Sequence, residues 1–140
     1  MSIWFQRPPV EQLNTMCQGN MLGHVGIAIV SIDDSGLTGT MPVDERTRQP
    51  FGILHGGASV VLAETLASMA ATFTIDIAKY SAVGLEVNAN HIRAIKSGFV
   101  TGRAEPIHIG KSTQVWEVRV TAEEKLASIH RITMAVLERN

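Results

Sequence analysis

Residues 49–64 read QPFGILHGGASVVLAE and open a long run that is almost free of charge. The run begins at the glycine pair Gly56 and Gly57 and contains a single charged side chain, Glu64. A helix that is apolar on every side is typical of a buried core. The pattern therefore predicts one long central helix over about residues 57–74, and it raises the question of why that helix holds one carboxylate.

Strand patterns lie on both sides of this helix. Before it, residues 25–43 read VGIAIVSIDDSGLTGTMPV, two β-rich runs about the turn DDSG, which predicts a hairpin. After it come about four further strand-like runs, and in the first the odd positions from Val83 to Ala89 are expected to share one apolar face. Antiparallel strands can bury one face against a helix. The predicted fold class is α+β, an antiparallel sheet wrapped around one long central helix.

Length and composition limit the class of protein. A chain of 140 residues can bury a core without disulfides and is most simply one domain, residues 1–140. Twelve Lys and Arg against 13 Asp and Glu give a formal charge of -1, so no binding to nucleic acid is expected. The single cysteine, Cys17, is expected in the core. It cannot form an internal disulfide, and the N-terminus lacks a secretory pattern, so we expect a cytoplasmic protein.

The central helix also approaches the length of a membrane span. However, it stands alone in the sequence and contains Glu64 together with several Ser and Thr residues. The rest of the chain has the pattern of strands that need an apolar element to cover. No membrane association is therefore expected.

The start of the helix is a candidate site for a carbonyl oxygen. The first backbone N–H groups of a helix have no partner within it, and the helix dipole favours negative charge there. Gly56 and Gly57 would leave these donors uncovered by side chains, as in an oxyanion hole. The alternative is that the two glycines only permit a tight turn from loop to helix.

Glu64 is the second candidate, because a carboxylate is rarely buried without a partner. No Lys or Arg lies within two turns on the helix, whereas Ser68 lies one turn further on the same face. A lone acid in an apolar wall suits a general base or a nucleophile. The alternative is a carboxylate that reaches solvent or has a structural role.

The spacing of Glu64 and Gly56 predicts the oligomer. Eight helical residues rise about 12 Å, a gap that the side chain and a substrate could bridge only when nearly fully stretched. The acid of one chain is therefore expected to face the helix start of another, in a homodimer with shared active sites. Unpaired edge strands would be natural dimer surfaces.

The sequence resembles the hotdog-fold acyl-CoA thioesterases over essentially its whole length. The resemblance rests on MPVDERTRQPFGILHGGASVVLAE (residues 41–64), VGLEVNANHIR (83–93) and PIHIGKSTQVWEV (106–118). The nearest branch includes aryl-CoA thioesterases of menaquinone synthesis, the proofreading thioesterase of enterobactin assembly and the Arthrobacter-type 4-hydroxybenzoyl-CoA thioesterase. It implies a hotdog fold, hydrolysis of an acyl-CoA, aryl-CoA or carrier-protein thioester, and a homotetramer built as a dimer of dimers.

The resemblance also assigns roles to single residues. Glu64 would be the catalytic carboxylate, either as nucleophile or as base for water, and Gly56 would donate its N–H to the thioester carbonyl. His55 would help to bind and polarise the substrate. Gln49 would orient the leaving thiolate or the attacking water, and Ser68 would hold the water.

Five further residues are candidates for substrate binding. His91 resembles the second histidine near the acyl pocket, although from the sequence alone it is equally a hydrogen-bonded residue at a strand end. Arg93, Lys111 and Ser112 lie at or beyond strand ends, where they are either contacts for the phosphates of CoA or solvated surface residues. Met69 would line the acyl pocket or pack in the core.

Thioester cleavage suits these residues without a cofactor. A thiolate leaves readily, so the reaction needs charge stabilisation at the carbonyl and an activated oxygen nucleophile. The five histidines show no metal-ligand spacing, so no metal is expected. Two other functions stay open: a hotdog hydratase or dehydratase with an Asp/His pair in another loop context, and a non-catalytic module that binds acyl thioesters.

Overall fold

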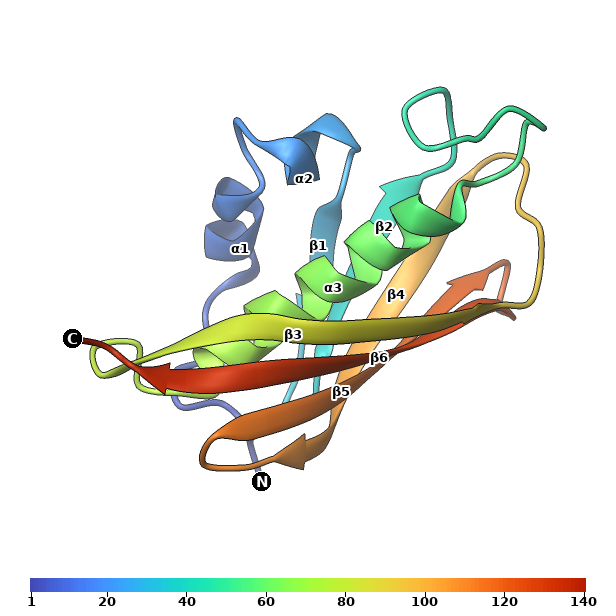
Figure 1. Ribbon diagram of the computed structural model, residues 1–140. Coiled ribbons are helices and arrows are strands. Elements are labelled where there is room, and N and C mark those ends of the chain that lie inside the picture. Colours follow the sequence, from blue (N-terminus) through green and yellow to red (C-terminus); the bar gives the residue numbers. More distant parts are fainter.

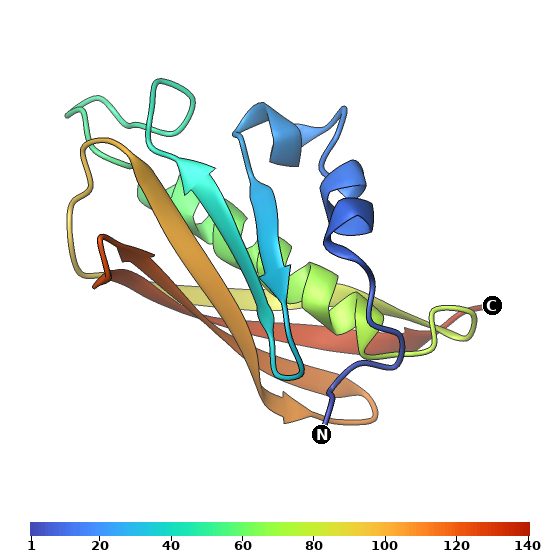
Figure 2. The same cartoon turned by 180° about the vertical axis from the view of Figure 1, so that it is seen from behind.

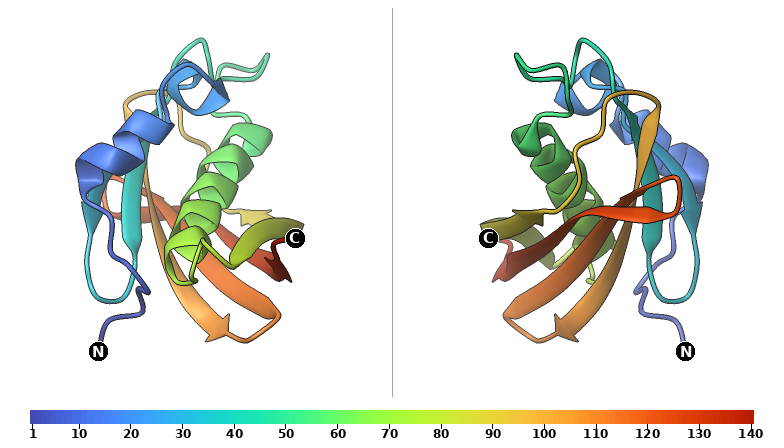
Figure 3. Two further views of the ribbon diagram at one scale, coloured as in Figure 1. Left: turned by 90° about the vertical axis from the view of Figure 1, so that its left-hand side faces the viewer. Right: turned by 90° about the vertical axis from the view of Figure 1, so that its right-hand side faces the viewer.

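A computed structural model describes all residues, 1–140 (Figure 1). The elements are, in chain order, α1 (Val10–Met16), α2 (Met21–His24), β1 (Ala28–Ile32), β2 (Leu37–Pro42), α3 (Gly56–Phe73), β3 (Tyr80–His91), β4 (Phe99–Ile109), β5 (Thr113–Ala122) and β6 (Lys125–Glu138). The six strands form one antiparallel sheet in the order β1-β2-β4-β5-β6-β3. The sheet curls around α3, as the end-on views of Figure 3 show. This arrangement confirms the predicted α+β class and the hotdog fold.

The central helix α3 packs against the concave face of the sheet. Its observed bounds, Gly56–Phe73, differ by one residue at each end from the predicted range. Leu66 fits into a hole between β2 and β4, because a Cβ on Gly39 or on Gly102 would lie 2.7 Å from one of its methyl groups. The two glycines are direct partners in the sheet. A fully buried leucine of this kind contributes about 1.5–3 kcal/mol of hydrophobic stabilisation.

By length and composition alone, α3 could cross a membrane. In the fold, half of its residues are buried against the sheet and the N-terminal segment. The apolar pattern of this helix is therefore explained by the core that it occupies.

The strand β5 contributes fully buried side chains to the core between the sheet and α3. Trp116, Val118 and Val120 have no exposed surface, as their alternation predicts. The indole N–H of Trp116 donates to Gln114 at 2.8 Å, and the Gln114 amide donates in turn to Thr74 at 2.8 Å. This buried chain of hydrogen bonds joins β5 to the end of α3.

The N-terminal segment covers the open side of α3 next to β1 (Figure 2). The helical spacing of Leu13, Met16 and Cys17 predicts one short helix that ends near Gly19, but α1 ends at Met16 and the separate helix α2 follows. Gly19 has a positive φ of 72°, which interrupts the helix, and the Asn20 side chain caps α2. Cys17 is 4% exposed, so its predicted place in the core is confirmed.

The edge strand β3 departs from the predicted alternation. Its pairing with β6 shifts register between Gly84 and Glu86. The inward positions are therefore even-numbered before the shift and odd-numbered after it, and Val83 and Leu85 are 41% and 62% exposed. The prediction that Val83 to Ala89 share one face was wrong, because one extra residue in a strand reverses its faces.

Candidate active site

The N-terminus of α3 leaves one backbone donor free. His55 caps the helix: its Nδ1 accepts the Gly57 N–H at 2.8 Å, and its carbonyl oxygen accepts the N–H groups of Ala58 and Ser59. The Gly56 N–H has no acceptor in the chain. The expectation that both glycines present donors was wrong for Gly57, whose N–H is used by the cap.

Gly56 lies in a cavity of about 330 Å³, here called the amide cavity, which is lined in part by Gln49, His91 and Arg93. The His91 ring lies over the glycine, because a Cβ on Gly56 would be 2.9 Å from the His91 Nε2 atom. The Gln49 side-chain oxygen accepts the Phe51 N–H, which leaves the Gln49 NH₂ group to donate elsewhere. Four predicted site residues therefore meet at the start of α3.

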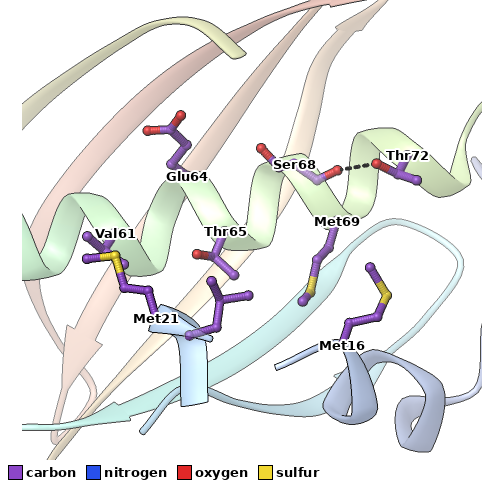
Figure 4. A pocket seen from close by; sticks show the side chains of 9 residues that line it. Met16, Met21, Val61, Glu64, Thr65, Ser68, Met69 and Thr72 are labelled. Carbon is purple, nitrogen blue, oxygen red and sulfur yellow. Dashed lines mark hydrogen bonds between the residues drawn. The ribbon is translucent and has the colours of Figure 1, made fainter. Parts of the chain in front are cut away.

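Glu64 lies in a second cavity of about 420 Å³, here called the acid cavity (Figure 4). The cavity separates α3 from the N-terminal segment, and its apolar wall includes Met16, Met21 and Met69. The half-buried Glu64 carboxylate has no hydrogen-bond or ion-pair partner in the chain. A Cβ on Gly84 would lie 3.0 Å from Glu64 Oε1, so the carboxylate rests against the inward glycine of β3.

Ser68 and Met69 also line the acid cavity. Figure 4 shows Ser68 and Glu64 on the same side of α3. The Ser68 hydroxyl donates to the Met134 sulfur at 3.8 Å and makes no hydrogen bond to the carboxylate. Met69 is 5% exposed, so it is both a core residue and part of the cavity wall.

The two cavities are separate in one chain and share no lining residue. Gly56 and Glu64 are eight residues apart on α3, a rise of about 12 Å. A free amide and an unpaired carboxylate thus face different spaces.

Nowhere in the structure do three or more His, Cys, Asp or Glu side chains converge as metal ligands would.

Lys111 and Ser112 lie at the other end of the sheet from Arg93. They form the turn between β4 and β5, and the Ser112 carbonyl accepts the N–H of Val136, late in β6. Arg93 follows β3, whose last residue pairs with Ser128, early in β6. Ser128 and Val136 are eight residues apart on β6, a distance of about 26 Å along the strand. One chain therefore does not bring Lys111 and Ser112 together with Arg93 on one phosphate.

Two buried polar residues of β6 were not predicted as site residues. Ser128 and His130 are each 1% exposed, and Ser128 Oγ lies 2.8 Å from His130 Nε2. The His130 ring stands edge-on to His91 with ring centroids 6.0 Å apart. Burial, together with the neighbouring His91, lowers the pKa of His130 to about 4. The alternation in ASIHRITM, which places both residues on the face of Ile132 and Met134, was the signal available in the sequence.

The family profile described as the thioesterase superfamily matches residues 51–128, more than half of the chain. The chain belongs to the thioesterase superfamily. The crystal structure of a glutamine-to-alanine variant of thioesterase PA1618 from Pseudomonas aeruginosa superposes on this thioesterase with a TM-score of 0.97. The two are 50% identical in sequence, and the match covers 99% of this chain and 100% of that one.

Two further relatives have names that state an activity. The 1,4-dihydroxy-2-naphthoyl-CoA hydrolase of Escherichia coli is 46% identical over 136 residues, 96% of this chain and 99% of that protein. The proofreading thioesterase EntH of Cronobacter sakazakii is 43% identical over 136 residues, 96% of this chain and 98% of that protein. These similarities confirm the predicted family and enzyme class: the protein is a thioester hydrolase.

Proposed function

We propose that this thioesterase hydrolyses acyl-CoA or aryl-CoA in a site that two chains build together. The observation that supports the proposal most is the presence of two complementary half-sites in separate cavities. One holds the free N–H of Gly56 and the other the unpaired carboxylate of Glu64. Each half lacks what the other supplies, so a facing second chain would complete both sites at once.

In the proposed reaction, the thioester carbonyl oxygen accepts the Gly56 N–H at the positive end of α3. Charge that develops on this oxygen is stabilised by the donor and by the helix dipole. The Gln49 NH₂ group orients the leaving sulfur or the attacking water. Glu64 of the other chain either removes a proton from a water molecule that attacks the carbonyl carbon, or attacks that carbon itself. In both routes the C–S bond breaks and the thiolate leaves with the CoA arm. In the second route, water then hydrolyses the anhydride between the acyl group and Glu64, which releases the acid and restores the carboxylate.

The acid cavity is the proposed place for the acyl group. Its wall contains the thioether side chains of Met16, Met21 and Met69, which are flexible and adapt to irregular shapes. An aromatic acyl group is proposed as the natural substrate, because the E. coli relative is named for an aryl-CoA. A carrier-protein thioester would present the same pantetheine arm, so a panel of aryl-CoA, straight-chain acyl-CoA and carrier-bound thioesters separates the substrate classes.

A basic groove next to the amide cavity is the proposed contact for the CoA phosphates. It measures about 290 Å³, shares Arg93 with the amide cavity, and is also lined by Lys96, Lys125 and one acid, Glu123. None of these three cations forms an ion pair in the chain. Phosphate groups would therefore meet positive charge that is not already neutralised.

The edge strand β3 is the proposed dimer contact. Its outer edge is unpaired in the sheet, and Val83 and Leu85 are exposed on it. If two copies of β3 paired antiparallel about a twofold axis, the Arg93 end of one would lie beside the first residues of the other. This pairing would bring the turn that contains Lys111 and Ser112 towards the partner's amide cavity. Two such dimers would form the proposed tetramer.

Replacing Glu64 by glutamine tests the proposal. We expect the rate of benzoyl-CoA hydrolysis, measured as the release of free thiol, to fall by orders of magnitude while the melting temperature is preserved. Glu11→Gln, which neutralises an exposed carboxylate on α1, is the matched control and should keep wild-type turnover. Unchanged turnover in the Glu64 variant would refute the catalytic role.

A single-turnover reaction in heavy-oxygen water tests the nucleophilic role of Glu64. Label in the enzyme carboxylate would indicate that Glu64 attacks the carbonyl and forms an anhydride, which water opens at the Glu64 carbonyl. Label in the acid product alone is expected for direct attack by water and for an anhydride that water opens at the acyl carbon.

A further inference from the structure

The amide cavity contains a buried hydroxyl group in addition to the Gly56 N–H and the Gln49 NH₂ group. Sites that stabilise an oxyanion commonly combine several donors. The His55 cap uses the Gly57 N–H, so the backbone supplies a single free N–H. Ser128 lines the same cavity, and its hydroxyl group is hydrogen-bonded to His130 Nε2.

The protonation of His130 determines where the Ser128 hydroxyl proton can point. A neutral imidazole has one N–H and one lone pair, and the low pKa of His130 keeps the ring neutral near pH 7. Nε2 has Ser128 Oγ as its partner, whereas the buried Nδ1 atom has no protein partner. Buried N–H groups without an acceptor are rarer than buried acceptors without a donor. The proton therefore belongs on Nε2, which donates to Ser128 Oγ.

This tautomer leaves the Ser128 hydroxyl proton without an acceptor in the chain. It also excludes Ser128 as a nucleophile activated by His130, because the Nε2 atom has no lone pair left to receive the serine proton. The hydroxyl remains a hydrogen-bond donor on the cavity wall.

The sheet register places this donor close to the helix start. Ser128 pairs directly with His91 across the two strands, and the Cβ atoms of such partners are about 4.5–5.5 Å apart on one face. The His91 ring in turn lies over Gly56. His91 is thus a direct neighbour of both Ser128 and Gly56 on the wall of the amide cavity.

We propose that Ser128 donates a second hydrogen bond to the thioester carbonyl oxygen, and that His130 is the positioning residue that fixes its hydroxyl. The inference rests on the proposed function, which places the thioester carbonyl at Gly56. Ser128 forms no covalent bond to the substrate and keeps its proton throughout.

Two analogues of benzoyl-CoA that cannot be hydrolysed test this proposal by calorimetry. The ketone analogue has a methylene group in place of sulfur and keeps the carbonyl, and the thioether analogue has a methylene group in place of the carbonyl. Ser128→Ala should weaken binding of the ketone about tenfold, which is the loss of one hydrogen bond, and leave binding of the thioether unchanged. Ser128→Thr, which retains a hydroxyl, should bind the ketone within about threefold of wild type.

Turnover of benzoyl-CoA supplies the second measurement. Ser128→Ala and His130→Phe should each lower kcat at least tenfold and raise KM by no more than the loss in ketone binding, because the bond made to the ground-state carbonyl strengthens as charge develops on oxygen. Thr133→Val removes a hydroxyl from the other face of β6 and should leave both constants unchanged. If Ser128→Ala does not fold, Ser128→Cys, with its weak S–H donor, takes its place with the same expectations.

Equal binding of the ketone by wild type and Ser128→Ala would overturn the proposal, as would a rise in KM with kcat unchanged. If the wild type bound neither analogue, the proposed function would be overturned as well. The two failures are therefore distinguishable.

Discussion

Replacing Gly56 by proline removes the N–H on which the proposed chemistry depends. Gly56 is the first residue of α3, a position where helices accept proline because that N–H needs no partner within the helix. His55, which would precede the proline, already has the extended ψ of 130° that such a residue prefers. We therefore expect the helix to form normally.

The expected magnitude follows from the hydrogen bonds at the helix start. Gly57, Ala58 and Ser59 all donate to His55, so no other N–H of this turn can replace the lost donor. Loss of one oxyanion donor costs about 2.7–4 kcal/mol, and we expect kcat for benzoyl-CoA to fall roughly 100- to 1000-fold.

Gly56→Ala is the matched control for this substitution. Alanine adds the same Cβ, which would approach the His91 ring to 2.9 Å, but retains the N–H. The ratio of kcat between the alanine and proline variants therefore isolates the donor from crowding at His91. Melting temperatures of both variants check the fold. A ratio near one, with both variants folded, would refute the assignment of Gly56 as the oxyanion donor.

Three further predictions concern stability and the position of the acid. Burial of His130 opposes its protonation, so the folded ring stays neutral down to about pH 4 while the unfolded ring takes up a proton near pH 6.5. As the pH is lowered over this window, the free energy of unfolding of the wild type should fall by roughly 3 kcal/mol more than that of His130→Phe. Equal falls for the two proteins, measured by urea unfolding, would contradict the assigned burial cost. Glu123 and Glu124, in the turn between β5 and β6, both have positive φ, 51° and 65°. Replacing the pair by Asn-Gly should therefore raise the free energy of unfolding by about 1–2 kcal/mol. An unchanged melting temperature would show that the turn is unstrained. Gly84→Ala should push the Glu64 carboxylate aside and lower kcat with little effect on unfolding, and wild-type kcat would show that the observed carboxylate position is unimportant.

The long helix and its chemistry could be predicted because their signals are local. The apolar run after HGG located α3 to within one residue, and the absence of a nearby cation singled out Glu64. The family resemblance supplied Gln49 and His91, which no pattern of charge or hydropathy marks. Both now lie in the amide cavity with Gly56.

The remaining features depend on contacts between distant segments. The register shift of β3 near Leu85 exists only in its pairing with β6, so strict alternation predicted the wrong faces. The use of the Gly57 N–H by the cap depends on the side-chain conformation of His55, which the sequence does not specify. Ser128 and His130 become neighbours of the site only once β6 lies beside β3.

The most direct test of a site shared between chains combines two inactive variants. Co-expressed Glu64→Ala and Gly56→Pro chains should form mixed dimers in which one site is intact, with Glu64 from the proline variant and Gly56 from the alanine variant. With random assortment of a twofold dimer, about a quarter of wild-type activity should return. Activity that stays at the sum of the two separate variants would contradict the shared site and place the reaction within one chain.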